Sequence, residues 1–134
     1  MFLDASAMVA ILSAEPEGTT LIRCLEDAEA PITSALAIFE TVSALSRKLK
    51  QDIAVSQSQV ERFLQAAGVR LVPIAAAESR AALAAHACYG KGRGHPAQLN
   101  FGDCFAYACA RVHEVPLLFI GDDFSRTDIR SAMA

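Results

Sequence analysis

Apolar residues follow two patterns along the chain, short continuous runs and longer amphipathic stretches. The clearest amphipathic stretch begins after Ser34, a residue type suited to cap a helix, and runs to about Lys50. Its apolar residues recur at the three- and four-residue spacing of one helical face: Ile38, Val42, Leu45 and Leu49. This pattern predicts a long helix with one buried face.

The remaining elements alternate in the same way. Four short apolar runs are typical of strands, at residues 2–3, 31–33, 69–72 and 116–120. Further helices are expected at 5–12, at 19–28, from Ser56 or Ser58 to about Gly68, at 75–89 and at 102–112, and a short last element at 125–128. Strands alternating with helices predict an α/β fold with a mostly parallel sheet covered on both faces. Without repeats or linkers, residues 1–134 are expected to form a single domain.

Composition supports a folded protein whose core is built from small and aliphatic side chains. Hydrophobic residues make up 53% of the chain and aromatic residues only 7%, with no Trp. No basic start leads into a long apolar run, and no apolar stretch approaches the ~20 residues that span a bilayer. We therefore expect a soluble cytoplasmic protein. The net charge of −3 does not itself indicate nucleic-acid binding, so local patches and metal ions would have to hold a polyanion.

The four cysteines do not form a metal-binding or redox motif. Cys24, Cys88, Cys104 and Cys109 include no C-x-x-C pair. We interpret them as buried apolar thiols rather than as zinc ligands or disulfide partners.

Acidic residues stand where a parallel sheet would gather them. Asp4 follows the first strand, and Asp122 and Asp123 follow the last one. Asp103 opens the helix before the last strand, and Glu40 lies in the helix after the second. Because ligands bind at the carboxyl ends of parallel strands, these acids are expected to meet at one rim.

Clustered carboxylates repel one another, and a hard divalent cation with oxygen ligands removes that repulsion. Such a cation can also activate water against a phosphodiester. Simpler roles remain open: Asp4 and Asp103 could only cap their helices, Glu40 could be solvated, and Asp122 and Asp123 could form an ordinary turn.

Four blocks of the sequence resemble the motifs of PIN domains, in the order in which that family has them. They are Met1–Ala7, Ala37–Val42, Leu99–Ala108 and Leu117–Phe124, the last continued by Thr127–Ile129. Together they span nearly the whole chain and are most similar to the VapC-like group, the toxins of bacterial toxin–antitoxin pairs.

This resemblance implies a PIN-like three-layer α/β/α sandwich and an endoribonuclease that depends on Mg²⁺ or Mn²⁺. It also implies cleavage of single-stranded RNA or an exposed RNA loop, a VapB-like antitoxin that masks the site, and a homodimer.

The resemblance assigns site residues as well. Three acids would hold the metal: Asp4, Glu40 and Asp103. Asp4 and Asp103 are expected to be the most direct ligands, with Glu40 acting partly through water, and Ser6 would support them. The fourth acid is Asp122 or Asp123, and Asp122 is favoured because it is nearer the strand end.

Basic residues near these blocks are candidates for RNA binding. Arg47 lies two helical turns after Glu40, and Lys91 and Arg93 lie in a glycine-rich loop. Asp103, Tyr107 and Arg111 form a second stripe at four-residue spacing, with an aromatic ring available for stacking. The alternative is that these side chains are only solvated.

Two other functions compete with this one. A PIN-like module could bind RNA or a partner without cleaving. A phospho-acceptor receiver domain is also a small α/β fold with an acidic metal site, but it needs an Asp closing the third strand. Here that strand ends Leu71–Pro73, without an acid.

Overall fold

The first strand occupies the interior of the sheet. In this computed structural model, which describes residues 1–134, the strands are β1 (Phe2–Leu3), β2 (Ile32–Thr33), β3 (Arg70–Leu71) and β4 (Leu117–Leu118). The order across the sheet is β3-β2-β1-β4, and all neighbouring strands are parallel. The predicted parallel sheet is confirmed, and its parallel neighbours require the helical crossovers that follow.

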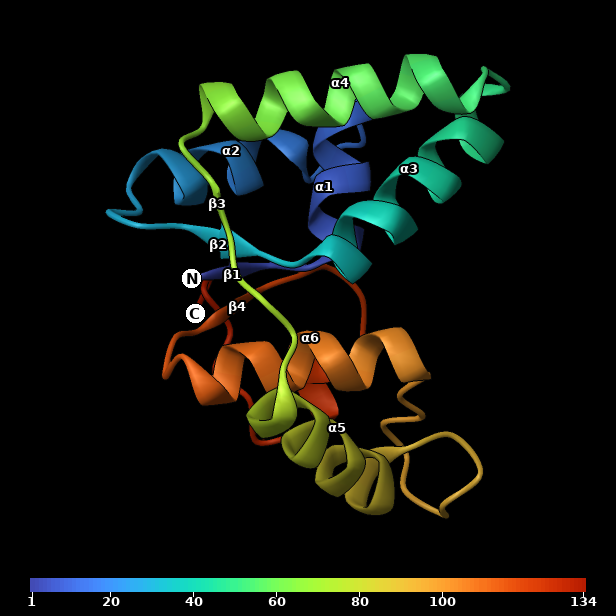
Figure 1. The fold of residues 1–134 in the computed structure, drawn as a ribbon, viewed down its shortest axis with the longest axis vertical. Coiled ribbons are helices and arrows are strands. Elements are labelled where there is room, and N and C mark those ends of the chain that lie inside the picture. Colours follow the sequence, from blue (N-terminus) through green and yellow to red (C-terminus); the bar gives the residue numbers. More distant parts are fainter.

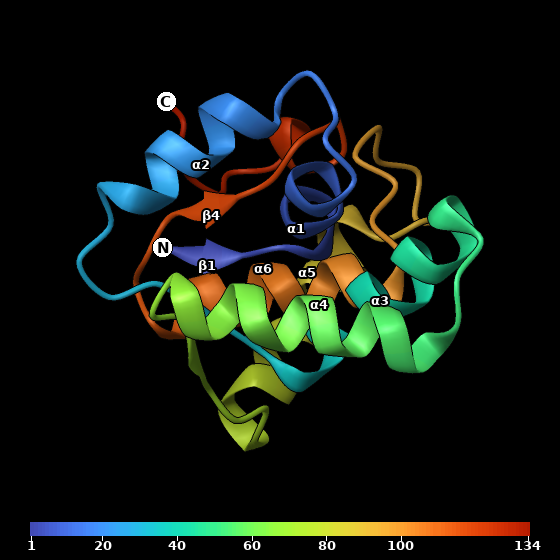
Figure 2. The same cartoon turned by 90° about the horizontal axis from the view of Figure 1, so that it is seen from above.

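Six α-helices cover the two faces of this sheet. They are α1 (Ala5–Leu12), α2 (Gly18–Glu26), α3 (Ala35–Leu49), α4 (Ile53–Ala66), α5 (Ala76–Tyr89) and α6 (Phe101–Val112). Figure 1 shows α1 to α4 on one side of the sheet and α5 and α6 on the other. The view from above places α4 on the outside of its layer (Figure 2). The predicted three-layer α/β/α fold is thereby confirmed. No helix is both long and apolar enough to cross a bilayer.

The core is built from the sheet and from small side chains of α6. Both residues of β1 and both residues of β4 are fully buried. On α6, Ala108, Cys109 and Ala110 are also fully buried. These small side chains let α6 pack closely on the sheet on one side and on α5 on the other.

Two details of the predicted helices are wrong. Helix α4 begins at Ile53 rather than at Ser56 or Ser58, and the buried Ser56 hydroxyl bonds to Ser46 Oγ (2.7 Å) and to Gln51 Nε2 (2.9 Å) instead of capping the helix. On α3, Ser34 is the cap, as predicted, but Leu49 at the end of the apolar stripe is 40% exposed. The last turn of α3 extends beyond the core.

The prediction of four buried thiols is also partly wrong. Cys104 and Cys109 are buried in α6, whereas Cys24 is half-buried and Cys88 is exposed on α5. All four are free thiols, as expected. Burial raises the pKa of Cys109 to about 11, with a contribution from the charge of Glu78, which makes this thiol a poor nucleophile.

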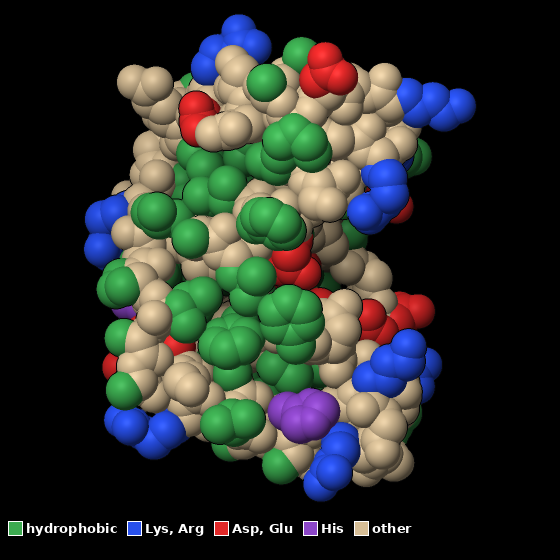
Figure 3. All heavy atoms as spheres, turned by 45° about the vertical axis from the view of Figure 1, so that its right-hand side comes forward, with side chains coloured by type: hydrophobic (Ala, Val, Ile, Leu, Met, Phe, Trp, Pro, Cys, Tyr) green, Lys and Arg blue, Asp and Glu red, His purple; other side chains and the backbone are tan.

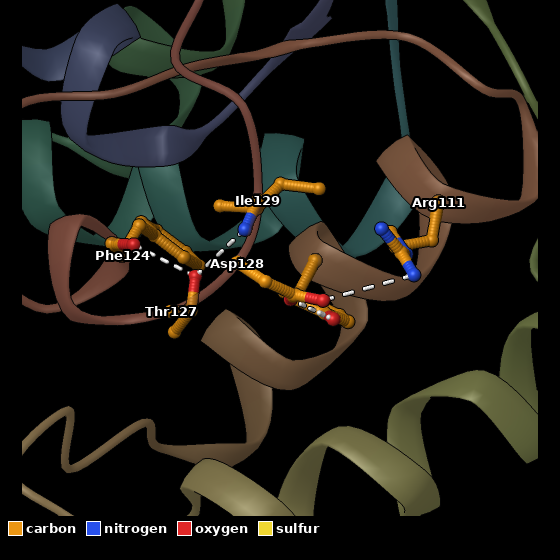
Figure 4. Close-up of polar contacts among 6 residues, drawn as sticks. Arg111, Phe124, Thr127, Asp128 and Ile129 are labelled. Carbon is orange, nitrogen blue, oxygen red and sulfur yellow. Dashed lines mark hydrogen bonds and ion pairs between the residues drawn. The ribbon is translucent and has the colours of Figure 1, made fainter.

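The segment after β4 is fastened to α6 by polar contacts (Figure 4). The Tyr107 hydroxyl donates to Asp128 Oδ1 at 2.5 Å, and Arg111 lies 3.8 Å from the other carboxylate oxygen. Thr127 Oγ1 donates to the Phe124 carbonyl at 2.7 Å and accepts from the Ile129 N–H at 3.2 Å. The contacts of Asp128 hold this segment against the helix that carries Asp103, and the bonds of Thr127 stabilise the turn within the segment.

Candidate acidic active site

Asp4 stands at the junction of β1 and α1. Its N–H donates to the Leu118 carbonyl (3.0 Å), which continues the pairing of β1 with β4 beyond the strand ends. Its Oδ2 accepts from the Ser6 N–H (3.0 Å) and from the Ser6 hydroxyl (2.6 Å). Ser6 Oγ in turn accepts from the Ile120 N–H at 3.2 Å. Asp4 therefore does cap α1, and Ser6 fixes its carboxylate relative to the end of β4.

Asp103 belongs to a capping box at the start of α6. Its N–H donates to Asn100 Oδ1 (2.9 Å), while its Oδ2 accepts from the Asn100 N–H (3.1 Å). One carboxylate oxygen is engaged in this way, and the other makes no hydrogen bond within the chain. Capping thus explains part of the placement of Asp103 and leaves one oxygen available.

Glu40 reaches from α3 across to the first turn of α6. A Cβ atom placed on Gly102 would lie only 2.1 Å from Glu40 Oε2 and 2.6 Å from its Cδ. The carboxylate therefore occupies space that exists only because residue 102 has no side chain. This contact brings the acid of α3 next to Asp103.

The three acids line one pocket of about 710 Å³. Its other lining residues include Ser6, Arg47 and two phenylalanines, Phe39 and Phe101. Figure 3 shows acidic side chains at the surface with hydrophobic side chains gathered around them. The chain thus brings Asp4, Glu40 and Asp103 together from segments far apart in the sequence, as the rule for parallel sheets predicted.

Burial raises the pKa of each acid, and the charge of at least one neighbouring acid adds to it. Burial raises the pKa of Glu40 to about 7, and the charges of Asp4 and Asp103 add to this effect. Burial likewise raises the pKa of Asp103 to about 6, against the opposing hydrogen bond from Asn100 and with help from Asp4 and Asp123. Burial also raises the pKa of Asp4, although the hydrogen bonds from Ser6 favour its charged form. The pocket therefore disfavours the charged forms of these acids as long as nothing of opposite charge binds there.

Of the two acids after β4, Asp123 is the one whose charge acts on the acids of the pocket. The charge of Asp123 raises the pKa of both Asp4 and Asp103, whereas Asp122 has no such effect on either. The chain turns at Gly121, whose φ is +96°, before it reaches these residues. Asp122 as the fourth acid stays a prediction, and Asp123 is the alternative that these charges support.

Of the predicted RNA-binding residues, some lie at the acidic pocket and others lie away from it. Arg47 lines the acidic pocket and has no ion-pair partner. Lys91 and Arg93 are exposed in the loop between α5 and α6, outside the lining of the pocket. The stripe through Tyr107 and Arg111 is not an RNA surface of the predicted kind, since Tyr107 is 92% buried and both side chains bind Asp128.

Sequence reasoning overlooked the two phenylalanines. Phe39 and Phe101 are 72% and 70% exposed, although large apolar side chains are usually buried. The available signal was their position: Phe39 lies off the apolar stripe of its helix, directly before Glu40, and Phe101 lies two residues before Asp103.

The donor set suits a hard divalent cation, but its atoms are not yet in ligating positions. No three Asp, Glu, His or Cys side chains are close enough together to hold a metal ion as they stand. The pocket nevertheless offers carboxylate oxygens from three segments of the chain, including the Asp103 oxygen that makes no hydrogen bond. A bound cation would offset the repulsion between these carboxylates.

Comparisons with known proteins agree along the whole chain. The family model of the PIN domain matches residues 1–130. Ribonuclease VapC42 of Mycobacterium tuberculosis is 40% identical over 132 residues, which cover 98% of each chain. A VapC ribonuclease of Rhizobium meliloti is 42% identical over 139 aligned positions, covering 96% of this chain and 98% of the relative. The crystal structure of Mycobacterium tuberculosis VapC20, described as a sarcin-ricin loop cleaving toxin, superposes with a TM-score of 0.76 at 18% identity and covers 96% and 95% of the two chains.

Proposed function

This chain belongs to the PIN domain family, and from that premise we propose that it is a metal-dependent, single-strand endoribonuclease acting in the cytoplasm as the toxin of a VapBC-type pair. The relatives that support this proposal are named as VapC ribonucleases and match nearly the full chain. The receiver-domain alternative is wrong, because the family is different and β3 ends without an acid.

One observation carries the proposal beyond family membership. Asp4, Glu40 and Asp103 come from three distant segments and line a single pocket, where the charge of Asp4 raises the pKa of both Glu40 and Asp103. Burying like charges together is costly unless something of opposite charge binds there. A ribonuclease site that uses a divalent cation accounts for this arrangement, whereas a purely structural role does not.

The residues present fit Mg²⁺ or Mn²⁺. Asp4, Asp103 and Glu40 would hold the ion, Asp123 would add negative charge, and no thiol or imidazole is needed. When bound, the ion supplies positive charge against the phosphate and favours deprotonation of an attacking water.

The residues around the acids set their positions before substrate arrives. Ser6 holds one oxygen of Asp4 and ties it to Ile120 at the end of β4. Asn100 holds one oxygen of Asp103, which leaves the other to face the pocket. Arg47 provides a free guanidinium on the α3 wall, where it can bind a phosphate next to the one that is cut. Preorganised charges of this kind favour hydrolysis of a phosphodiester.

The test is cleavage of a mixed single-stranded RNA with and without Mg²⁺ or Mn²⁺. The wild type is compared with Asp4→Asn, which keeps the shape of the side chain and removes its charge. We expect cation-dependent cuts in the wild type and a loss on the order of 10²-fold or more in the variant.

Asp27→Asn is the matched control, because Asp27 is an exposed acid at the end of α2. It should cleave as the wild type does. Equal cleavage by Asp4→Asn would refute the acid site. No cleavage by a correctly folded, uninhibited wild type would favour the PIN-like module that binds without cutting.

We further propose a VapB-like antitoxin and a homodimer. An inhibitor that lays an apolar helix near the pocket and places a basic side chain against the acids would offset their charge. Purification from cells that also express the neighbouring gene tests this idea. A chain that always emerges without a small bound protein would contradict it, and sedimentation of the free chain tests the dimer.

A further inference from the structure

Two walls of the acidic pocket each present an exposed aromatic ring. Phe39 comes from α3 and Phe101 from the first position of α6, and both line the pocket. They are the most exposed large apolar side chains of the molecule, at 72% and 70%. Neither belongs to the hydrophobic core. Packing in the core therefore does not explain these two rings.

The α3 wall continues from its ring to a cation. Phe39, Ser43 and Arg47 follow one another at four-residue spacing, and all three line the pocket. Phe39 and Arg47 are therefore two turns apart, about 12 Å along the helix axis. The neighbouring Lys48 is paired with Glu15, so Arg47 is the unpaired cation of this wall.

We propose that Phe39 and Phe101 are stacking platforms for two bases of a single-stranded RNA whose backbone crosses the acids towards Arg47. The inference rests on the proposed function and specifies how that site would hold the bases of its substrate. An aromatic face stacks on any base, and a nearby cation such as Arg47 binds a phosphate of the same strand.

The layout of the pocket favours RNA over a protein partner. A helix docking by its apolar side needs a continuous apolar groove. Here the two rings come from different helices, and the carboxylates of Glu40 and Asp103 line the same pocket. Figure 3 shows acidic side chains bordered by hydrophobic ones on one face of the molecule. Single-stranded RNA also combines planar groups with charged groups, because its bases are joined by charged phosphates. It can therefore place bases on the rings and phosphates near a bound cation or Arg47.

The experiment measures binding rather than cleavage. Fluorescence anisotropy in a metal chelator compares a mixed-sequence RNA oligonucleotide with one of equal length whose bases are replaced by abasic units. The proteins are the wild type, Phe39→Ala, Phe101→Ala and their Phe→Tyr counterparts. Leu83→Ala is the matched control, since Leu83 is 66% exposed on α5 and outside the pocket.

We expect the wild type to prefer the base-bearing oligonucleotide. Each Phe→Ala change should weaken that binding about tenfold while leaving abasic binding unchanged, and Phe→Tyr should restore it. Leu83→Ala should behave as the wild type. Thermal melting checks the fold, which truncation of exposed side chains should spare.

Three results would overturn the proposal. One is equal binding of both oligonucleotides by the wild type, undetectable binding included. Another is unchanged binding in both Phe→Ala variants. The third is a change of oligomeric state in those variants without a change in RNA binding, which would make this face a protein interface. RNA cleavage by the wild type, together with unchanged RNA binding in both Phe→Ala variants, would reject this inference alone. Weakened RNA binding in those variants, without RNA cleavage by the wild type, would reject only the nuclease activity.

Discussion

At the scale of single residues, the acidic site depends on groups that carry no charge. Ser6 and Asn100 each occupy one oxygen of a carboxylate, and Gly102 leaves room for a third carboxylate. The glycine is the most informative of these, because its contribution is the absence of a side chain. The atoms that a Cβ would meet there belong to the far end of Glu40, which can move without disturbing the backbone.

Gly102→Ala should therefore separate activity from stability. We expect stability to be unchanged or to rise by less than about 1 kcal/mol, because alanine is the better helix former. RNA cleavage should fall by on the order of 10²-fold, because the Glu40 carboxylate is displaced. Urea unfolding and single-turnover cleavage measure the two effects.

A double-mutant cycle identifies the route of the effect. If Gly102 acts only through Glu40, Gly102→Ala should cause no further loss in a Glu40→Gln background. An independent loss in that background would show that the alanine disturbs α6 itself.

At the scale of elements, the sequence predicted correctly those features that depend on neighbouring residues. The cap at Ser34 and the four apolar runs were found because caps and strand patterns are read from a few neighbouring residues. The start of α4 and the burial of Tyr107 were not, because both depend on partners elsewhere in the chain. The stripe through Tyr107 was correct as helical geometry. It is buried rather than free because the segment containing Asp128 folds back over it.

Tyr107→Phe tests how α6 holds that segment. The change removes the 2.5 Å hydrogen bond to Asp128 and keeps the ring. Because the carboxylate is 53% exposed, the loss of stability should be about 1 kcal/mol or less. Hydrogen exchange should speed up in the segment from Phe124 to Ala132 and remain unchanged in α3. Unaltered exchange there would mean that the remaining contacts, such as that of Arg111, are sufficient.

At the scale of the whole molecule, the order of the strands assembles the site. Asp4 and the turn after Ile120 follow adjacent strands, while Glu40 and Asp103 arrive on helices from opposite faces of the sheet. The rule for parallel sheets was enough to predict this meeting from sequence. The choice between Asp122 and Asp123 was beyond it, because one turn at Gly121 sets their direction. The exposure of Phe39 and Phe101 was equally hidden, since it depends on what the pocket leaves uncovered.

Because the acids are gathered in one buried site, the free energy of unfolding of the metal-free protein should fall as pH rises. Burial and the charges of Asp4 and Asp103 raise the pKa of Glu40 from 4.5 to about 7 on folding. Between these values the folded chain binds more protons than the unfolded chain, so the contribution of Glu40 to stability falls as pH increases. Glu40→Gln removes this effect. The variant should therefore be more stable than the wild type at about pH 8 and nearly equal to it at about pH 5.

Divalent cation should reverse that difference, because an ion that binds only the folded state stabilises it. We expect Mg²⁺ or Mn²⁺ to raise the melting temperature of the wild type by several degrees at about pH 8 and by much less at about pH 5, where protons compete for the carboxylates. Glu40→Gln should show a smaller rise, and Glu61→Gln, on the exposed side of α4, should match the wild type. Melting curves at both pH values, with chelator and with cation, measure all of these effects without RNA. If Glu40→Gln gained as much from the cation as the wild type did, Glu40 would have no part in holding the ion, and the site would rest on Asp4 and Asp103.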